Sequence, residues 1–133
     1  IPTFLKKRSE NYKEISKRLK QLNFLTVLPE SNNRLLSSHY CLCVILNKSI
    51  AKYRSKIMNS LGKKGIGSSI YYPHPVPRLS YYKNKYNLNK KNFVNASCIS
   101  DCSIALPVGP HLNKKDMKFI ANTLIKIIKN FIR

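Results

Sequence analysis

Acidic side chains are scarce in this chain, whose 133 residues include 5 Asp and Glu against 25 Lys and Arg. With only 3 histidines, few side chains are left for acid–base catalysis, and no Ser-His-Asp or Cys-His spacing typical of a nucleophilic enzyme is recognisable. No apolar run approaches the roughly 20 residues that a membrane-spanning helix needs. These absences exclude a membrane-spanning protein and leave the sequence without a candidate catalytic residue.

The excess of basic residues gives a formal net charge of +20, which favours polyanions such as nucleic acid. The 19 lysines, however, occur singly or in short runs along the whole chain, whereas a nucleic-acid interface usually concentrates its charges. Lysine is accompanied by 14 Asn and 14 Ile, and all three residue types have adenine- and thymine-rich codons. Genome composition therefore explains much of the excess, and we favour a solvated lysine surface over a nucleic-acid partner.

The chain opens with Ile1, Pro2 and Thr3, without an initiator Met or a secretory leader. We therefore expect a piece of a longer protein that resides in the cytoplasm. A length of 133 residues suits a single domain with a real core, because such a chain buries about two thirds of its unfolded surface.

The four cysteines have the spacings C-x-C (Cys41 and Cys43) and C-x3-C (Cys98 and Cys102). Zinc ligands usually come as C-x2-C or C-x4-C pairs with supporting histidines, so these spacings do not predict a metal site. Cys41 and Cys43 lie in an apolar run, where a strand would place both on one face as small hydrophobic residues. We expect core packing and free thiols, in keeping with a reducing cytoplasm.

Two amphipathic helices are predicted at the ends of the chain. Residues 3–23 place an apolar stripe at helical spacing opposite a row of lysines. Toward the other end, Asn113 and Asp116 form a variant of the capping box and open a helix with a second apolar stripe. The stripes consist of Leu5, Tyr12, Ile15, Leu19 and Leu22 in the first helix and of Met117, Ile120, Ala121, Leu124, Ile127, Ile128 and Phe131 in the second.

The region between these helices predicts short strands and helices separated by turns. The near-continuous apolar run 39–46 is typical of a central strand that is buried on both faces. Prolines at positions 73, 75 and 77 make 72–78 a stiff extended loop, because each removes a backbone donor and biases its predecessor to extended geometry. In order, we expect a strand at 24–28, a polar loop at 30–37, the strand at 39–46, a helix capped by Ser49 that ends at Gly62 or Gly65, a strand at 66–72, the extended loop, a helix at 93–102, a strand at 103–106 and a turn at 107–112. This order predicts an α+β fold.

The extended loop is the candidate binding segment. Its aromatic and cationic side chains, with those that follow it, are Tyr71, Tyr72, His74, Arg78, Tyr81 and Tyr82. Such side chains on a rigid loop often contact ligands, but a packed cover over the core would use the same residues. The residues alone leave both interpretations open. The glycines just before the loop do not predict a phosphate loop, because a helix ends and a strand begins there, which is the reverse of the order that a phosphate loop needs.

Three blocks of the chain carry a resemblance to a known family. They are LGKKGIGSSIYYPHP at 61–75, YYK at 81–83 and SIALPVGPHL at 103–112, before the final helix. Together they resemble the C-terminal part of the DegT/DnrJ/StrS sugar aminotransferases, in which a helix ends at Lys-x-Gly-Ile-Gly, a strand runs into an aromatic-Tyr-Pro loop, and a Leu-Pro turn precedes the closing helix. Arg8, Asn11, Tyr12 and Leu19 also fit the long helix that joins the two domains of that family, so the resemblance covers essentially the whole chain.

This resemblance implies the small C-terminal domain of the aspartate-aminotransferase architecture, fold type I of the pyridoxal-phosphate enzymes, with a short sheet packed against helices. Residues 1–23 would be the linking helix and residues 24–133 the small domain. The family is dimeric and transfers an amino group from an amino acid, usually glutamate, to a nucleotide-linked keto sugar in amino-sugar or surface-polysaccharide biosynthesis.

The same resemblance assigns pyridoxal 5'-phosphate to a large N-terminal domain that this sequence does not contain. In the family that domain carries the Schiff-base lysine, the carboxylate that pairs with the pyridine nitrogen and the phosphate-binding residues. A Schiff-base lysine must be desolvated, whereas the lysines of this chain are expected on polar helix faces and in loops. We therefore expect the 133 residues to be inactive alone and to expose an apolar face where the large domain would pack.

Tyr71, Tyr72 and Pro73 match the loop that lies near the sugar-nucleotide site of the family's dimer. Many members have a histidine at the position of Tyr71 and a second one where this chain has a proline, whereas this chain offers His74 and Arg78. By resemblance, Tyr71, Tyr72, His74 and Arg78 are therefore the expected substrate-binding residues. Arg78 would pair with a phosphate and a tyrosine would stack on a base or sugar face. No residue is assigned to catalysis, to the cofactor or to a metal.

Two other hypotheses are kept. A small basic nucleic-acid-binding module would use lysines with the tyrosine pairs 71–72 and 81–82 as stacking platforms. A structural interaction domain without a ligand would bury the proline-rich loop.

Overall fold

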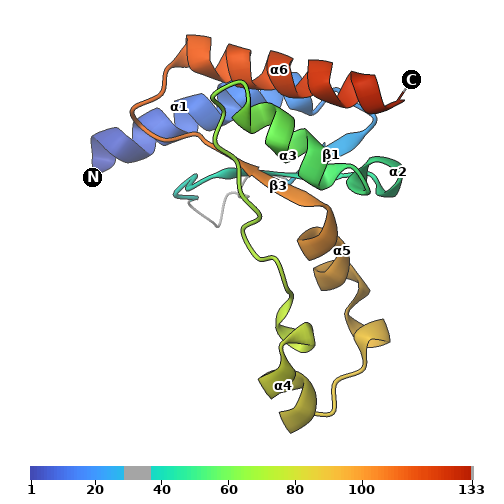
Figure 1. The fold of residues 1–133 in the computed structure, drawn as a ribbon. Coiled ribbons are helices and arrows are strands. Elements are labelled where there is room, and N and C mark those ends of the chain that lie inside the picture. The colour runs from blue at the N-terminus through green and yellow to red at the C-terminus, as the bar shows by residue number, and fades with distance from the viewer. Residues whose placement is uncertain (29–36, 133) are drawn as a thin grey trace.

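The computed structural model describes residues 1–28 and 37–132, without the side chains of residues 90 and 91. The elements, in chain order, are α1 (Pro2–Leu19), β1 (Leu25–Val27), β2 (Leu42–Leu46), α2 (Lys48–Ala51), α3 (Arg54–Gly62), the 3-10 turn η1 (Val76–Arg78), α4 (Ser80–Lys85), the 3-10 turn η2 (Lys90–Phe93), α5 (Val94–Cys102), β3 (Ser103–Leu106) and α6 (Lys114–Ile132). They form a body of helices over a sheet, and an arm, residues 72–102, that projects away from the sheet on the side opposite α6 (Figure 1). The α+β class is confirmed.

The sheet has three antiparallel strands in the order β1-β2-β3. Its register places Val44 of β2 between Val27 of β1 and Ile104 of β3. Because successive side chains of a strand point to opposite faces, Leu42, Val44 and Leu46 all face one side, where each is at most 1% exposed. That side of the sheet is the floor of the hydrophobic core.

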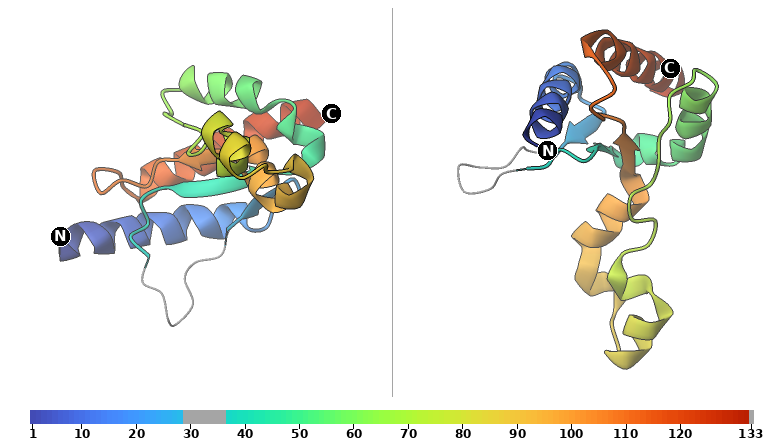
Figure 2. Two further views of the ribbon diagram at one scale, coloured as in Figure 1. Left: turned by 90° about the horizontal axis from the view of Figure 1, so that it is seen from below. Right: turned by 90° about the vertical axis from the view of Figure 1, so that its left-hand side faces the viewer.

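Helices α1 and α6 lie side by side over this floor, and α3 packs against α6 (Figures 1 and 2). Ile15 and Leu19 of α1, Ile57 of α3, and Leu124 and Ile128 of α6 are fully buried between helices and sheet. The predicted apolar stripes are therefore confirmed within the helices, with Leu5, Ile127 and Phe131 half-buried at their margins. The first helix ends at Leu19 rather than at residue 23, so Leu22 lies beyond it, half-buried. No helix of the described chain is long and apolar enough to cross a bilayer.

The predicted start of the last helix is confirmed in atomic detail. Asn113 Oδ1 accepts hydrogen bonds from the backbone N–H groups of Lys115 and Asp116, at 2.7 and 3.2 Å. Asp116 Oδ2 in turn accepts the N–H of Asn113 at 2.8 Å. The reciprocal pair satisfies amide donors that the first turn of a helix leaves without an intrahelical partner.

The central strand is shorter than expected. It begins at Leu42 rather than at residue 39, because His39 has a left-handed φ of 46° that breaks extended geometry. The prediction that it is buried on both faces is wrong, since its buried side chains alternate with half-buried ones. Cys41 and Cys43 do share one face, with their sulfurs 3.7 Å apart, but it is the less buried face. Of the four free cysteines, Cys102 alone is fully buried.

The strand expected at 66–72 does not form. Ser69 alone bridges to Ala105 of β3, through N–H to carbonyl hydrogen bonds of 3.2 and 2.8 Å. Beyond this bridge the chain leaves the sheet edge for the arm, where Pro73 and Pro75 have no N–H to donate to a ladder.

The helix expected from Ser49 is divided into α2 and α3, and Ser49 lies inside α2 instead of capping it. The N-cap is Asn47, whose carbonyl accepts the N–H groups of Ile50 and Ala51, both at 2.9 Å. The predicted left-handed stop is at Gly65, with a φ of +73°, where the Ile66 N–H bonds back to the Leu61 carbonyl at 3.0 Å.

Two features of the arm differ from expectation. The loop at 72–78 contains the 3-10 turn η1, and the short helix α4 was not predicted at all. The helix at 93–102, the strand at 103–106 and the turn before α6 are confirmed. The polar loop predicted at 30–37 lies, except for Ser37, outside the described residues.

Candidate functional site

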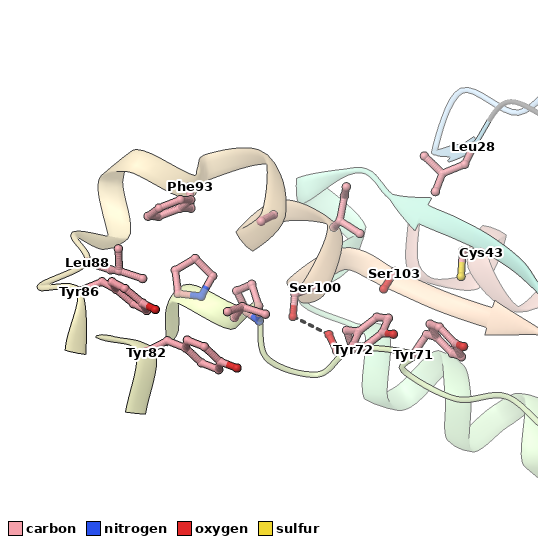
Figure 3. A pocket seen from close by; sticks show the side chains of 15 residues that line it. Leu28, Cys43, Tyr71, Tyr72, Tyr82, Tyr86, Leu88, Phe93, Ser100 and Ser103 are labelled. Atoms are coloured by element: carbon pink, nitrogen blue, oxygen red, sulfur yellow. Dashed lines mark hydrogen bonds between the residues drawn. The ribbon is translucent and has the colours of Figure 1, made fainter. Parts of the chain in front are cut away.

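A cleft of about 730 Å³ opens where the arm meets the uncovered side of the sheet. Figure 3 shows its two ends, with the tyrosines of residues 71 and 72 near the strands and an aromatic group on the arm. Its lining residues are Leu28, Cys43, Tyr71, Tyr72, Pro75, Val76, Pro77, Tyr82, Tyr86, Leu88, Phe93, Ala96, Ile99, Ser100 and Ser103. The walls are mostly apolar and aromatic. Such walls suit a ligand with a flat or hydrophobic surface.

Tyr71 and Tyr72 form the sheet end of the cleft. Their rings meet edge to face, with centroids 4.8 Å apart, and Tyr71 also contacts Tyr40 at 5.7 Å. Tyr71 is 47% exposed and Tyr72 is 68% exposed, so each ring still offers a face to a ligand. Partial loss of hydration, with smaller effects from the neighbouring tyrosines and thiols, raises the pKa of Tyr71.

At the arm end of the cleft, the sequence indicated Tyr82 but not Tyr86, Leu88 or Phe93. Tyr82 and Tyr86 stack with centroids 6.4 Å apart and ring planes 10° apart, and Leu88 and Phe93 complete this end. The spacing of four residues between Tyr82 and Tyr86 is a helical spacing, and it could have indicated α4. Lys83 and Lys85 lie between the two tyrosines and make this helical spacing hard to recognise in the sequence.

The C-terminal end of α5 holds the loop in place. Ser100 Oγ donates a hydrogen bond of 2.7 Å to the carbonyl of Tyr72 (Figure 3). The carbonyl of Ser100 accepts a 2.6 Å hydrogen bond from Nη1 of Arg54 in α3. One residue thus connects the predicted binding loop to α5 and, through Arg54, to the body.

Arg78 is engaged by a carboxylate. Its Nη1 and Nη2 donate to the two oxygens of Asp101, both at 2.6 Å, in the planar two-point geometry typical of an Arg–carboxylate pair. These bonds hold the pKa of Asp101 below its ordinary range, with smaller contributions from the charges of Arg54 and His74. The side chain expected to receive a phosphate is therefore already paired in this structure.

His74, the remaining residue of the predicted site, is exposed and close enough to Asp101 for their charges to interact.

Cys43 lines the cleft, but burial and its neighbour Cys41 raise the pKa of this thiol to about 12, so it is protonated at neutral pH. Within residues 1–28 and 37–132, no three His, Cys, Asp or Glu side chains gather as metal ligands would. The cleft offers a ligand aromatic and apolar surface together with the hydroxyl-bearing residues Ser100 and Ser103.

The lysines do not fit the attachment of pyridoxal phosphate. Of the 19, all but Lys90 and Lys91 have described side chains, and among these 17 only Lys7 is half-buried while the others are exposed. A lysine that forms a Schiff base at neutral pH needs a desolvated or cationic environment that lowers its pKa. Among the described side chains, no lysine is desolvated in this way.

Comparison with known proteins agrees with the family resemblance of the three sequence blocks. The model of the DegT/DnrJ/EryC1/StrS aminotransferase family matches residues 1–125. Helicobacter pylori PseC, an aminotransferase involved in the biosynthesis of pseudoaminic acid, superposes on 97% of this chain with a TM-score of 0.81 and 23% identity. The PLP-form of Streptococcus pneumoniae Spr1654 superposes on 98% of it, with a TM-score of 0.83 and 22% identity.

A third similar structure is the sugar aminotransferase CalS13 from Micromonospora echinospora, with a TM-score of 0.72 and 16% identity over 92% of this chain. At these identities the superpositions show a shared fold. The chain spans only about a third of each of these proteins, 34%, 32% and 30% respectively.

Proposed function

The chain belongs to the DegT/DnrJ/EryC1/StrS aminotransferase family, and from this premise we propose that it is the C-terminal small domain of a pyridoxal-phosphate-dependent sugar aminotransferase. The family match over residues 1–125 carries the proposal, because it covers nearly the whole chain. The shared fold supports it, since each similar structure is about three times as long as this chain.

The proposal divides the work between two domains. A large domain preceding residue 1 holds pyridoxal phosphate, which when bound supplies the electron sink for moving an amino group. The donor is an amino acid, with glutamate as the first candidate, and the acceptor is a nucleotide-linked keto sugar. The complete enzyme works in the cytoplasm as a homodimer. The absence of a buried lysine among the described side chains agrees with this division.

In this proposal the contribution of the chain is to bind and enclose substrate. Tyr71 and Tyr72 offer exposed ring faces to the sugar or the base, and His74 is available for a polar contact at the rim. Arg78 contacts a phosphate only if the ligand competes with Asp101. The apolar wall of the cleft either excludes water from the bound substrate or packs against the large domain.

One observation favours the rival nucleic-acid module. Lys85 Nζ lies 5.3 Å and 5.5 Å from the ring centroids of Tyr81 and Tyr86, a cation and aromatic cluster of the kind that stacks bases. This rival predicts single-strand binding that falls steeply with salt and is lost in Tyr81→Ala. The aminotransferase proposal predicts weak binding that Tyr81→Ala leaves nearly unchanged.

The direct test uses the intact protein loaded with pyridoxal phosphate. We expect L-glutamate to convert the bound cofactor to its amine form, visible in the absorbance spectrum, and nucleotide-linked keto sugars to reverse the change. Mass spectrometry should then find an amino sugar. A protein that responds to no amino acid would contradict the proposal, and one that responds to amino acids but only to keto acids as acceptors would contradict the sugar assignment.

A further inference from the structure

The segment that carries Tyr71 and Tyr72 has little structure of its own. Within residues 71–75 two of the five are prolines without an N–H, and the side chains of Tyr71, Tyr72 and His74 are exposed. Because Tyr72 leaves the sheet after the single bridge at Ser69, no strand pairing sets its position. Its placement must come from contacts made by other elements.

Those contacts converge on two consecutive residues of α5. Ser100 binds the carbonyl of Tyr72 at the start of the segment, and Asp101 binds Arg78 at its end. The segment is thus held at two points, Tyr72 and Arg78, which lie five residues before and one residue after Pro77. Arg54 holds α5 itself from the body side through the Ser100 carbonyl.

We propose that Asp101, acting through Arg78, is a positioning residue for the aromatic substrate loop, and that Arg78 serves as its anchor rather than as a phosphate ligand. The inference rests on the proposed function, because the loop is taken to bind the keto-sugar substrate. Asp101 itself touches no substrate. Its effect is to fix the turn η1 against α5, so that Tyr71 and Tyr72 are presented in one orientation.

The planar geometry explains why both partners matter. Two parallel N–H to oxygen bonds fix the angle as well as the distance between η1 and α5, which a lysine, with a single charged nitrogen, would not do. The Asp101 side chain is 48% exposed and that of Arg78 is 28% exposed, so solvent weakens the pair. We therefore expect Asp101→Asn to change the equilibrium constant between the anchored and the released loop by a factor of about 2 to 5.

The test compares Asp101→Asn with Glu14→Gln in the intact protein. Glu14 pairs with Arg18 on α1, at 3.2 Å, so the control also removes the carboxylate partner of an arginine, here a half-buried one that lies away from the cleft. Asp101→Asn should raise KM for the keto sugar about 2- to 5-fold, with kcat and the reaction with the amino donor unchanged. Glu14→Gln should alter none of these values.

A charge exchange gives the rescue test. Either Arg78→Asp or Asp101→Arg alone should raise KM. The double variant should have a lower KM than either single variant, although Arg54 and His74 repel an arginine at position 101. An unchanged KM in Asp101→Asn, or an equal rise in Glu14→Gln, would overturn the proposal.

Hydrogen exchange provides a readout that does not depend on activity. The amides of Arg78 and Leu79 donate to the carbonyls of Pro75 and Val76 within η1, at 2.8 and 3.1 Å. Their exchange should accelerate in Asp101→Asn and not in Glu14→Gln. If the intact protein has no transaminase activity, the proposed function fails, while unchanged exchange in Asp101→Asn overturns the anchoring role independently.

Discussion

The body of this molecule and its arm are stabilised by different kinds of interaction. In the body, side chains from α1, α3 and α6 are completely buried over the sheet, and apolar burial is the main source of stability. In the arm, every residue from Ser80 to Asn87 is exposed, and polar contacts at its base fix its position. The apolar sequence pattern of the body therefore determines how it folds. The arm depends instead on a few specific hydrogen bonds, and its exposed surface is available to bind a partner.

The comparison also separates stability from function. Substitutions in the buried core of the body should lower the free energy of unfolding and affect activity only through folding. Substitutions in the arm should leave global stability nearly unchanged and alter what the cleft binds. The predictions below test this division, from the largest expected effect to the smallest.

The largest loss of stability is expected for Leu124→Ala in α6. Leu124 is fully buried, so the substitution removes apolar contacts and leaves a cavity, at a cost of about 2–5 kcal/mol. Phe119→Ala on the same helix is the matched control, because Phe119 is 53% exposed and should change stability by less than about 1 kcal/mol. Urea unfolding followed by circular dichroism measures both. Equal effects would contradict the assignment of the core.

Asn11→Ala tests a polar tie inside the body. The buried Asn11 Nδ2 donates to the carbonyls of Gly109 and Leu112, at 2.9 and 3.0 Å, and fixes α1 to the turn before α6. Losing these two hydrogen bonds from a buried amide should cost about 1–3 kcal/mol in the same urea experiment. Asn11→Asp keeps the shape but cannot donate when ionised, so it should also destabilise, and more at pH 7 than at pH 4. An Asp variant as stable as wild type would show that donation is not what matters.

The cap of α6 should have a smaller effect. Asn113→Ala removes the acceptor for two amides of the first turn, and we expect a loss of about 0.5–2 kcal/mol. Asn113→Ser, which restores a capping oxygen, should recover most of it. Thermal unfolding of the three proteins is sufficient, and an Asn113→Ala variant with an unchanged melting temperature would refute the capping role.

The smallest effect on global stability is expected at the ion pair of the arm. Because the folded-state pKa of Asp101 is depressed, the pair contributes stability above the unfolded pKa of about 4 and loses it as the pH falls through the lower folded value. NMR of the Arg78 guanidinium should therefore be constant from pH 7 to about pH 5 and change on further acidification. In Asp101→Asn this acid transition should be missing, and its persistence would assign it to another group.

The same division explains what could be predicted from sequence. The two long helices and β1 followed from apolar spacing, and the cap at Asn113 and the stop at Gly65 followed from local hydrogen-bond chemistry. These features depend on residues a few positions apart. The strand expected at 66–72 failed because strand formation there depends on an edge partner, and a single bridge is all that the sheet provides.

The candidate site shows the same limit. Tyr71 and Tyr72 were found because the loop motif places them at the cleft, but the pairing of Arg78 with Asp101 joins residues 23 positions apart. No periodicity connects such residues. At the aromatic end, Tyr82 lies in a helix of six residues and Tyr86 follows directly after it, so the segment is too short for an apolar pattern to be recognised among its lysines.

The central claim is that cofactor chemistry takes place outside these 133 residues. The direct measurement is borohydride reduction of the intact protein after loading with pyridoxal phosphate, followed by proteolysis and mass spectrometry of the labelled peptide. We predict one labelled lysine, in a peptide that precedes Ile1. A label on any of the 19 lysines of this chain, or no specific label in a correctly folded protein, would contradict the claim.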